Sequence, residues 1–245
     1  MRKECYDKNA DNSIQEMTAP KPILISIEGD IGAGKSTLIW QLKSLFPTWH
    51  FIDEPVGTWL DLKNADGTNL LELFYKDKDR YAYTFQNCAV LSRAMNIQKA
   101  ITAWQEECTT KPEAAQHNIF ITERCLETDV NVFAKMMYDD KKLNDIEWSL
   151  YNMWYSYVKD QTPSLSGIIY LTTPPEICAE RITLRGRKGE EAIPLEYLQQ
   201  LDRYQRNWIY NPRPWSLKKL EYRNFDVNQT TLDEVQSFVE SVRST

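Results

Sequence analysis

The fold class can be inferred from one stretch at positions 28–37, which reads Glu-Gly-Asp-Ile-Gly-Ala-Gly-Lys-Ser-Thr. These residues follow the apolar run Ile-Leu-Ile-Ser-Ile at 23–27 and precede a helical pattern at 36–46. They therefore match the phosphate-binding loop G-x-x-x-x-G-K-[ST] in its required strand-loop-helix context. Glycines let such a loop curl so that successive backbone N–H groups point at phosphate oxygens, and the following helix adds its positive dipole end. We therefore predict a nucleotide-binding protein.

The residues of this loop have distinct predicted roles. Lys35 would reach the β- and γ-phosphates, and the Ser36 hydroxyl would ligate Mg²⁺. ATP is thus the predicted phosphate donor and Mg²⁺ the predicted metal cofactor. The predicted ATP-binding residues of the loop are Gly29, Asp30, Ile31, Gly32, Ala33, Gly34, Lys35, Ser36 and Thr37.

Composition restricts the class of protein. A net charge of −6 argues against nucleic acid or an anionic membrane as a partner, because both require a basic surface. Five cysteines, an odd number without metal-binding spacing, are typical of reduced thiols inside a cell. No apolar stretch approaches membrane-spanning length. We predict a soluble, cytoplasmic protein with no nucleic-acid or membrane partner.

The chain length of 245 residues suits one large α/β domain, and no break in the pattern marks a second. The first 19 residues are polar and carry both acids and bases, unlike a signal or transit peptide. We predict a flexible tail at 1–20 and a single domain at 21–245.

The hydrophobic pattern alternates between strands and helices. Short apolar runs predict buried parallel strands at 23–27, 50–52, 119–122, 168–171 and 220–227. Helical patterns occupy 36–46, 80–106, 128–138, 144–157, 176–184, 194–210 and 232–242. This alternation predicts an α/β fold, a five-stranded parallel sheet with helices on both faces. Ligands bind outside the carboxyl ends of such strands, so the residues that follow each strand are the candidate site.

Acidic and basic residues stand at two of these strand ends. Glu54 precedes Pro55 after the second strand, where a carboxylate could accept a proton from a hydroxyl that attacks ATP. A solvated acid in a pre-proline turn is the alternative. After the third strand, Glu123 could hold Mg²⁺ and Arg124 could steady the acceptor hydroxyl and the transferring phosphoryl group. The alternative there is a surface ion pair.

A basic segment follows the fourth strand. Arg181 and Arg185 lie four residues apart on one helix face, and Arg187 follows between two glycines. This pattern indicates an arginine-rich lid that closes cations over the phosphates, although charge runs are often only solvated helix faces. We predict that the lid arginines act in catalysis together with Lys35, Glu54 and Arg124.

Taken together, these motifs resemble the deoxyribonucleoside kinase family, from about Pro22 to Val242. The matching motifs are the phosphate loop, Glu-Pro-Val at 54–56 with Trp59, the segment 75–86 ending in Tyr-Thr-Phe-Gln, Glu-Arg at 123–124, the lid, Ile-Pro-Leu-Glu-Tyr-Leu at 193–198 and Asp-Val-Asn at 226–228. The resemblance implies a P-loop kinase fold. It also implies an ATP-dependent transferase that phosphorylates the 5′-hydroxyl of a deoxyribonucleoside in nucleotide salvage.

The resemblance also implies residue roles. Glu54 would be the general base, with Arg124 near the 5′-hydroxyl, and Tyr75 and Glu190 would bind the 3′-hydroxyl. Gln86 would pair with the base edge, and Phe133 would stack on the base opposite Phe85. The implied substrate-binding residues are Glu54, Trp59, Tyr75, Phe85, Gln86, Arg93, Arg124, Asp129, Phe133 and Glu190. Asp226, Val227 and Asn228 would lie against the adenine of ATP. Arg181 and Arg185 of the lid would also bind ATP.

Two residues bear on the choice of base. Arg93 follows Gln86 by two helical turns, so both face the same side of the helix, and Asp129 begins the next helix. Family members of the deoxycytidine and deoxyguanosine type carry this Arg and Asp. Asp129 can accept a hydrogen bond from an exocyclic amine, and Gln86 can donate one to the adjacent ring nitrogen. We predict deoxycytidine and/or purine deoxynucleosides as substrates, and thymidine as a poor one.

The aromatic helix at 144–157 predicts a homodimer. Trp148, Tyr151, Trp154 and Tyr155 offer more aromatic surface than one core-facing stripe needs, and the resembling family dimerises through helices of this region.

Three residues depart from the common pattern of the family. Cys125, Asp30 and Gly32 stand where the family commonly has serine, asparagine and alanine, from which we expect altered rate or donor preference.

Other functions are also considered. A nucleoside monophosphate kinase of the thymidylate type shares the fold and is the main alternative, but Glu54 would clash with its acceptor phosphate. A GTPase-like switch would need D-x-x-G and N-K-x-D, which are absent from the sequence. A silent nucleotide-binding adaptor would leave Glu54 and the lid arginines without a role.

Overall fold

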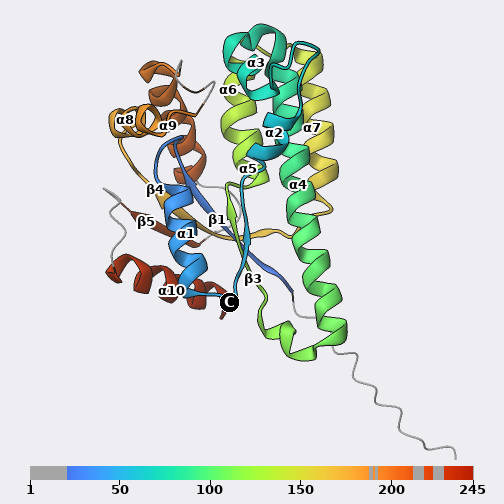
Figure 1. The fold of residues 1–245 in the computed structure, drawn as a ribbon, viewed down its shortest axis with the longest axis vertical. Coiled ribbons are helices and arrows are strands. Elements are labelled where there is room, and N and C mark those ends of the chain that lie inside the picture. The colour runs from blue at the N-terminus through green and yellow to red at the C-terminus, as the bar shows by residue number, and fades with distance from the viewer. Residues whose placement is uncertain (1–20, 188–189, 191–192, 212–217, 223–228, 245) are drawn as a thin grey trace, which may run out of the picture.

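A parallel sheet of five strands forms the centre of the computed structural model, which describes residues 21–187, 190, 193–211, 218–222 and 229–244. The strands are β1 (Ile23–Gly29), β2 (His50–Ile52), β3 (Ile119–Glu123), β4 (Leu165–Leu171) and β5 (Lys218–Tyr222). Their order is β2-β3-β1-β4-β5. Helices surround this sheet in Figure 1. All neighbours are parallel, with Ile25 of β1 opposite Ile121 of β3 and Gly167 of β4. The predicted α/β fold is confirmed.

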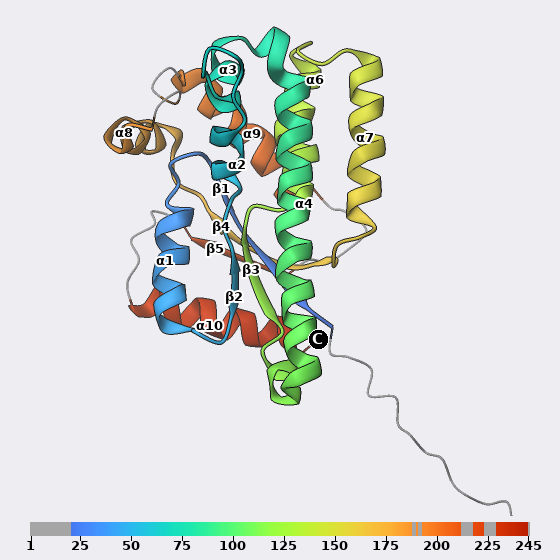
Figure 2. The same cartoon turned by 45° about the vertical axis from the view of Figure 1, so that its right-hand side comes forward.

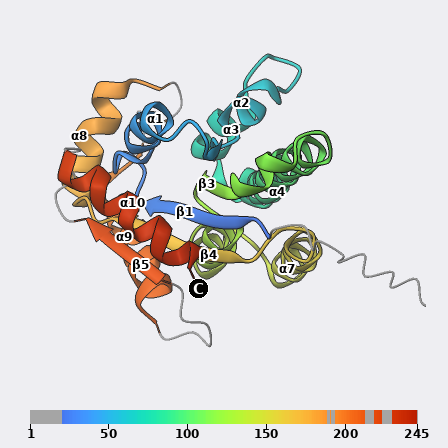
Figure 3. The same ribbon diagram turned by 90° about the horizontal axis from the view of Figure 1, so that it is seen from below.

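The central strands are buried because helices cover both faces of the sheet (Figure 3). Ile25 and Ile27 of β1 and Phe120 and Ile121 of β3 are wholly inaccessible to solvent. This burial explains why the strands read as continuous apolar runs rather than as alternating ones. The predicted strand at 220–227 begins two residues earlier, at Lys218, and its predicted second half lies outside the described residues.

Six helices match predicted helical segments. They are α1 (Lys35–Leu45), α4 (Lys78–Thr110), α7 (Asp145–Lys159), α8 (Pro175–Arg185), α9 (Leu195–Tyr210) and α10 (Gln229–Arg243). Helix α7 begins with a capping box, in which the Asn144 side chain accepts from the Glu147 backbone and the Glu147 side chain accepts from the Asn144 backbone. Helix α4 runs along the molecule with α7 packed beside it (Figure 2).

The region around the site departs from the sequence predictions. Helices α2 (Val56–Asp61) and α3 (Leu70–Lys76) and the 3₁₀ turn η1 (Pro112–Gln116) were not predicted. Elements this short owe their stability to tertiary packing and carry little periodic signal. The predicted helix at 128–138 is instead divided into α5 (Leu126–Thr128), the π-helical segment η2 (Asp129–Ala134) and α6 (Lys135–Asp139). A π-helical turn breaks the 3.6-residue period and is frequent at functional sites.

Among the described helices, none is both long enough and apolar enough to cross a membrane. The four cysteines in the described residues, Cys88, Cys108, Cys125 and Cys178, are free thiols.

Candidate active site

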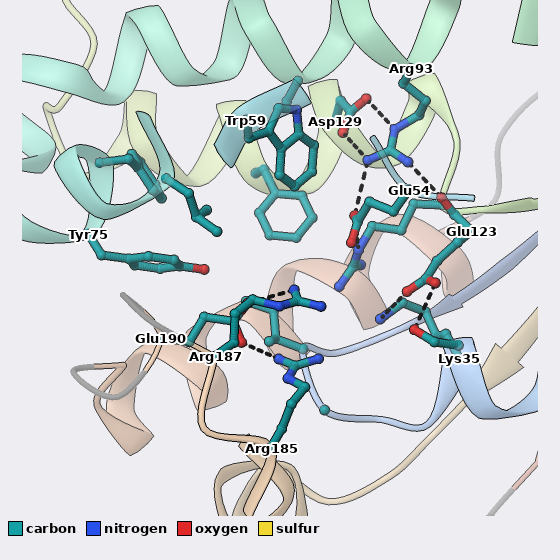
Figure 4. A pocket seen from close by; sticks show the side chains of 18 of the residues that line it. Lys35, Glu54, Trp59, Tyr75, Arg93, Glu123, Asp129, Arg185, Arg187 and Glu190 are labelled. Carbon is teal, nitrogen blue, oxygen red and sulfur yellow. Dashed lines mark hydrogen bonds and ion pairs between the residues drawn. The ribbon is translucent and has the colours of Figure 1, made fainter. Parts of the chain in front are cut away.

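A cavity of about 660 Å³ lies at the carboxyl ends of β1, β2 and β3 (Figure 4). It is bounded by the phosphate loop, by α2 to α4, and by Arg187 and Glu190 between α8 and α9. Such a volume is typical of a small-molecule site. The predicted site residues that line it are Ile31, Gly32, Gly34, Lys35, Ser36, Thr37, Glu54, Trp59, Tyr75, Phe85, Gln86, Arg93, Glu123, Arg124, Asp129, Phe133, Arg181, Arg185, Arg187 and Glu190. Gly29, Asp30 and Ala33 of the loop do not line the cavity. Asp226, Val227 and Asn228 lie outside the described residues.

The loop conformation requires glycine at position 32. The φ of Gly32 is +84°, in the left-handed region, and a Cβ atom there would lie 2.6 Å from the carbonyl oxygen of Cys178 in α8. An alanine would therefore meet backbone that cannot move aside. The glycine that the sequence carries here is a steric requirement of the packing between the loop and α8.

Lys35, Ser36 and Glu123 meet where the loop joins α1. The Lys35 ammonium donates to the carbonyl oxygens of Gly29 at 3.2 Å and Asp30 at 2.8 Å, and lies 3.8 Å from a Glu123 carboxylate oxygen. The Ser36 hydroxyl donates to the other Glu123 oxygen at 2.9 Å. A hydroxyl beside a carboxylate is a donor set that suits Mg²⁺, whose remaining ligands are usually phosphates and water. In the described part of the chain no three His, Cys, Asp or Glu side chains are grouped as a metal site.

Glu54 is a nearly buried carboxylate between two arginines. Its Oε1 atom lies 3.3 Å from Nη2 of Arg93 and 3.4 Å from Nε of Arg124. Burial opposes ionisation, but Arg124, Arg93 and Lys35 outweigh it and hold the pKa of Glu54 below its ordinary value. Glu54 is therefore ionised at neutral pH and able to accept a proton.

Arg124 has an unusual backbone conformation directly after β3. Its φ is +62°, which is uncommon for a residue with a side chain, and its backbone N–H donates to the Ile27 carbonyl at 3.1 Å. The guanidinium carbon lies 4.8 Å from the centre of the Phe133 ring. Its Nη1 atom is buried with no hydrogen-bond partner among the described residues. The strained backbone thus holds a cation with an unused donor beside Glu54.

A second buried cation, Arg93, lies on the other side of Glu54. It donates to the Asp129 carboxylate through Nε at 2.8 Å and Nη2 at 3.3 Å, and to the Glu123 carbonyl through Nη1 at 2.6 Å. Burial disfavours its charge, but Asp129 and Glu54 outweigh that cost and raise the pKa of Arg93. Two helical turns earlier on α4, both polar atoms of the Gln86 amide are buried and unpartnered in the described structure, and Gln86 lines the same cavity. A buried amide of this kind is costly unless a ligand satisfies it.

Aromatic side chains form one wall of the cavity. The Phe85 ring stacks on Phe74, with centroids 4.4 Å apart, and meets Trp59 edge-on at 5.2 Å. The Trp59 indole N–H donates to the Ser92 hydroxyl at 3.1 Å, which fixes the ring. This wall offers apolar contact to a flat ligand next to the Gln86 amide.

The three predicted lid arginines line the cavity, and one of them contacts the phosphate loop. Arg181 donates to the Ala33 carbonyl at 3.2 Å. Arg187 donates to Glu190 at 3.0 Å, and Arg185 pairs with the other oxygen of the same carboxylate. In Figure 4 the Tyr75 hydroxyl and Glu190 lie at the same end of the cavity. The structure therefore brings the predicted cations and both predicted sugar-binding residues to one cavity.

Sequence reasoning missed several residues of this region. Gln41, Leu71, Phe74 and Tyr197 also line the cavity. Leu71 and Phe74 belong to α3, whose short pattern was not recognised as a helix.

Glu28 was also missed as a structural residue. It is wholly buried, accepts from Thr128 at 2.6 Å and Gln205 at 3.0 Å as well as from Ser26, and so ties β1 to the segment that carries Asp129. The available signal was an acid that directly follows the apolar run at 23–27. Cys125 lies 3.3 Å from the Thr128 hydroxyl rather than lining the cavity.

Comparison with known proteins agrees with this geometry. The sequence model of the deoxynucleoside kinase family matches residues 25–244. The chain is 36% identical to deoxycytidine kinase 2 of Gallus gallus over 89% of this chain and 90% of that protein, and 34% identical to human deoxycytidine kinase over 89% of each. It is 35% identical to the mitochondrial deoxyguanosine kinase of Xenopus laevis over 76% of this chain and 72% of that protein. The chain therefore belongs to the deoxynucleoside kinase family and is an ATP-dependent deoxynucleoside kinase.

Proposed function

We propose that this enzyme transfers the γ-phosphoryl group of ATP to the 5′-hydroxyl of deoxycytidine, and of purine deoxynucleosides, in nucleotide salvage. The observation that carries the base preference is the unpartnered Gln86 amide in the same cavity as the Arg93–Asp129 pair. Cytosine and adenine place an amine next to an acceptor nitrogen, which complements an Asp acceptor and a Gln donor. Relatives named as deoxycytidine and deoxyguanosine kinases support the same preference.

Each of the cavity residues has its own role in the proposed reaction. Ionised Glu54 accepts the proton of the 5′-hydroxyl as the oxygen attacks, and the free donor of Arg124 steadies that oxygen. Lys35 and the lid arginines stabilise the charge on the transferring phosphoryl group. Tyr75 and Glu190 hold the 3′-hydroxyl, and Phe85 and Phe133 contact the base. Mg²⁺, held by Ser36 and Glu123, would neutralise and orient the donor phosphates.

The geometry disfavours a nucleoside monophosphate kinase of the thymidylate type. Such an enzyme would need to place an acceptor phosphate beside Glu54, whose pKa is lowered and whose carboxylate is therefore charged. Two anions in one partly buried site repel each other strongly.

A product analysis tests the proposed position of transfer. We expect ATP and deoxycytidine to give deoxycytidine 5′-monophosphate and ADP, identified by phosphorus NMR. Deoxycytidine lacking the 5′-hydroxyl should give no phosphorylated product. Phosphate found at the 3′-position, or turnover of a monophosphate in preference to the nucleoside, would refute the assignment.

We also propose a cytoplasmic location, which the free thiols of the described cysteines support, because such thiols are usual in reducing compartments.

A homodimer formed through α7 is a further part of the proposal. Tyr151 is buried and Trp148 stacks between it and Tyr138, so these two aromatics belong to the core rather than to a partner surface. The exposed apolar side chains of α7 are instead Ile146, Leu150, Met153, Trp154 and Tyr157. Five such residues on one helix form a patch that is typical of a protein interface.

We predict that light scattering at micromolar concentration gives about twice the 28.8 kDa chain mass. Met153 is 68% exposed, and Met153→Glu places a charge in the patch, so it should weaken the dimer about tenfold or more. Trp40→Glu is the matched control, because Trp40 is equally exposed but lies on α1. A monomeric parent protein would refute the dimer.

A further inference from the structure

Asp30 is an acid buried under the phosphate loop without a hydrogen-bond partner. Asp30 is only 3% exposed to solvent, and neither oxygen of its carboxyl group has a hydrogen-bond partner among the described residues. The backbone carbonyl of Asp30 accepts from Lys35, but the side chain does not line the cavity. The mechanism above leaves this carboxyl group unused.

The titratable and charged groups around the carboxyl come from five parts of the fold. They are Lys35 of α1, Arg124 after β3, Tyr170 of β4, Cys178 of α8, and Asp202 and Arg206 of α9.

Each cation among these neighbours already has its own partner. Arg206 makes two bonds to Asp202, at 2.8 and 2.7 Å. Lys35 is bound to the loop carbonyls, and Arg124 lies 3.4 Å from Glu54. An ionised Asp30 would therefore be a buried charge with no partner of its own and with Asp202 repelling it. Burying such a charge is costly, whereas a neutral carboxyl group avoids most of the cost.

We propose that Asp30 carries a proton when the phosphate loop holds the donor nucleotide, so that the donor binds only to the protonated loop. Where the carboxylate is ionised, it takes up one proton from solvent as the nucleotide binds, and no other bond changes. The proposal rests on the role of this loop as the donor site. It assigns a function to the acid that replaces the commonly found asparagine, which is neutral at every pH.

The direction of the pH effect follows from the surroundings. Burial raises the pKa of Asp30 to about 7, and Asp202 adds to the rise against the opposing Arg124, Lys35 and Arg206. The negative charge of bound triphosphate raises it further. Donor affinity should be full below pH 7, where the carboxyl is neutral, and should fall as the pH rises above 7.

The test measures the dissociation constant of a hydrolysis-resistant ATP analogue with excess Mg²⁺ between pH 6.5 and 8.0. Asp30→Asn keeps the shape of the side chain but cannot titrate, so the ratio of parent to variant constants cancels titration of the analogue. We expect this ratio to rise about four- to eightfold over the range. Calorimetry in two buffers of different ionisation enthalpy should show proton uptake in the parent in excess of that in the variant. Asp79→Asn, at an acid whose side chain is 76% exposed, is the control that should behave as the parent.

Thermal unfolding supplies a readout that needs no ligand. Between about pH 4 and pH 7 the folded parent holds a proton on Asp30 that the unfolded chain, with its ordinary pKa of 3.8, has released. As the pH rises from 4 to 7, the Tm of the parent should therefore fall relative to the Tm of Asp30→Asn. Above pH 7 the difference between the two Tm values should stay constant. A pH-independent ratio of dissociation constants would overturn the role of Asp30 alone. Failure of both folded proteins to bind the analogue at any pH would instead overturn the loop as donor site, and this proposal with it.

Discussion

Replacing Glu54 with glutamine is expected to lower kcat about a hundredfold or more while leaving donor affinity nearly intact. Glutamine keeps the shape of the side chain but cannot accept the proton of the attacking hydroxyl. The carboxylate lies between Arg93 and Arg124 and is held ionised by them, so its loss removes the proposed acceptor of this proton. Steady-state rates of ADP formation, with donor binding measured separately, check the prediction.

The neighbouring acid supplies the control for this experiment. Asp53 is 67% exposed at its side chain and pairs with Lys43 at 2.8 Å, away from the cavity. Asp53→Asn should therefore keep kcat within about threefold of the parent, because exposed ion pairs contribute little. A Glu54→Gln variant that also stayed within threefold of the parent would show that Glu54 is not the base.

The double variant Arg93→Met with Asp129→Ala should shift base preference toward thymidine. It removes the charged pair that leaves the N3–H and methyl group of thymine badly matched, and it opens space for that methyl group. We expect kcat/KM for thymidine relative to deoxycytidine to rise tenfold or more, about 1.4 kcal/mol. Since Arg93 also donates to the Glu123 carbonyl and lies 3.3 Å from Glu54, absolute rates should fall, so the ratio is the measured quantity.

The single variants are the controls for this pair. Either change alone leaves a buried charge without its main partner, so each single variant should lose activity or stability without the gain in relative thymidine use. A parent enzyme that already prefers thymidine, or a double variant with an unchanged ratio, would contradict the role of the pair in base selection. The kinase assignment would remain in either case.

The sheet could be predicted from the sequence because its strands are buried on both faces. Phe120 and Ile121 are inaccessible, so β3 begins with the unbroken apolar run Ile-Phe-Ile at 119–121, which stands out against its surroundings. The same sequence did not predict α2 or α3. Trp59 and Phe74 on these helices are held by packing around Phe85, a contact that depends on residues far apart in the chain. Local sequence patterns therefore predict buried strands well, but they do not predict short helices that are stabilised by contacts with distant residues.

The site could be predicted where it depends on strand ends and a fixed motif. Glu54 and Glu123 end parallel strands, so topology alone brings them to the edge of the sheet where the loop lies. The left-handed backbone of Arg124 and the contacts of Glu28 with two other segments follow from three-dimensional packing and leave no periodic signal. The burial of Asp30 beneath the loop is equally invisible in the motif, which constrains its glycines, lysine and serine but leaves this position free.

The most direct test of this account is a comparison of kcat/KM for deoxycytidine, deoxyadenosine, thymidine and thymidine monophosphate under one set of conditions, with saturating ATP and Mg²⁺. We expect deoxycytidine to have the highest or nearly the highest kcat/KM, deoxyadenosine to be phosphorylated as well, and thymidine to have a low kcat/KM. We also expect no measurable turnover of the monophosphate, because its phosphate would meet the ionised Glu54 carboxylate. Preference for thymidine or its monophosphate over deoxycytidine would contradict the proposed roles of Gln86, Arg93 and Asp129.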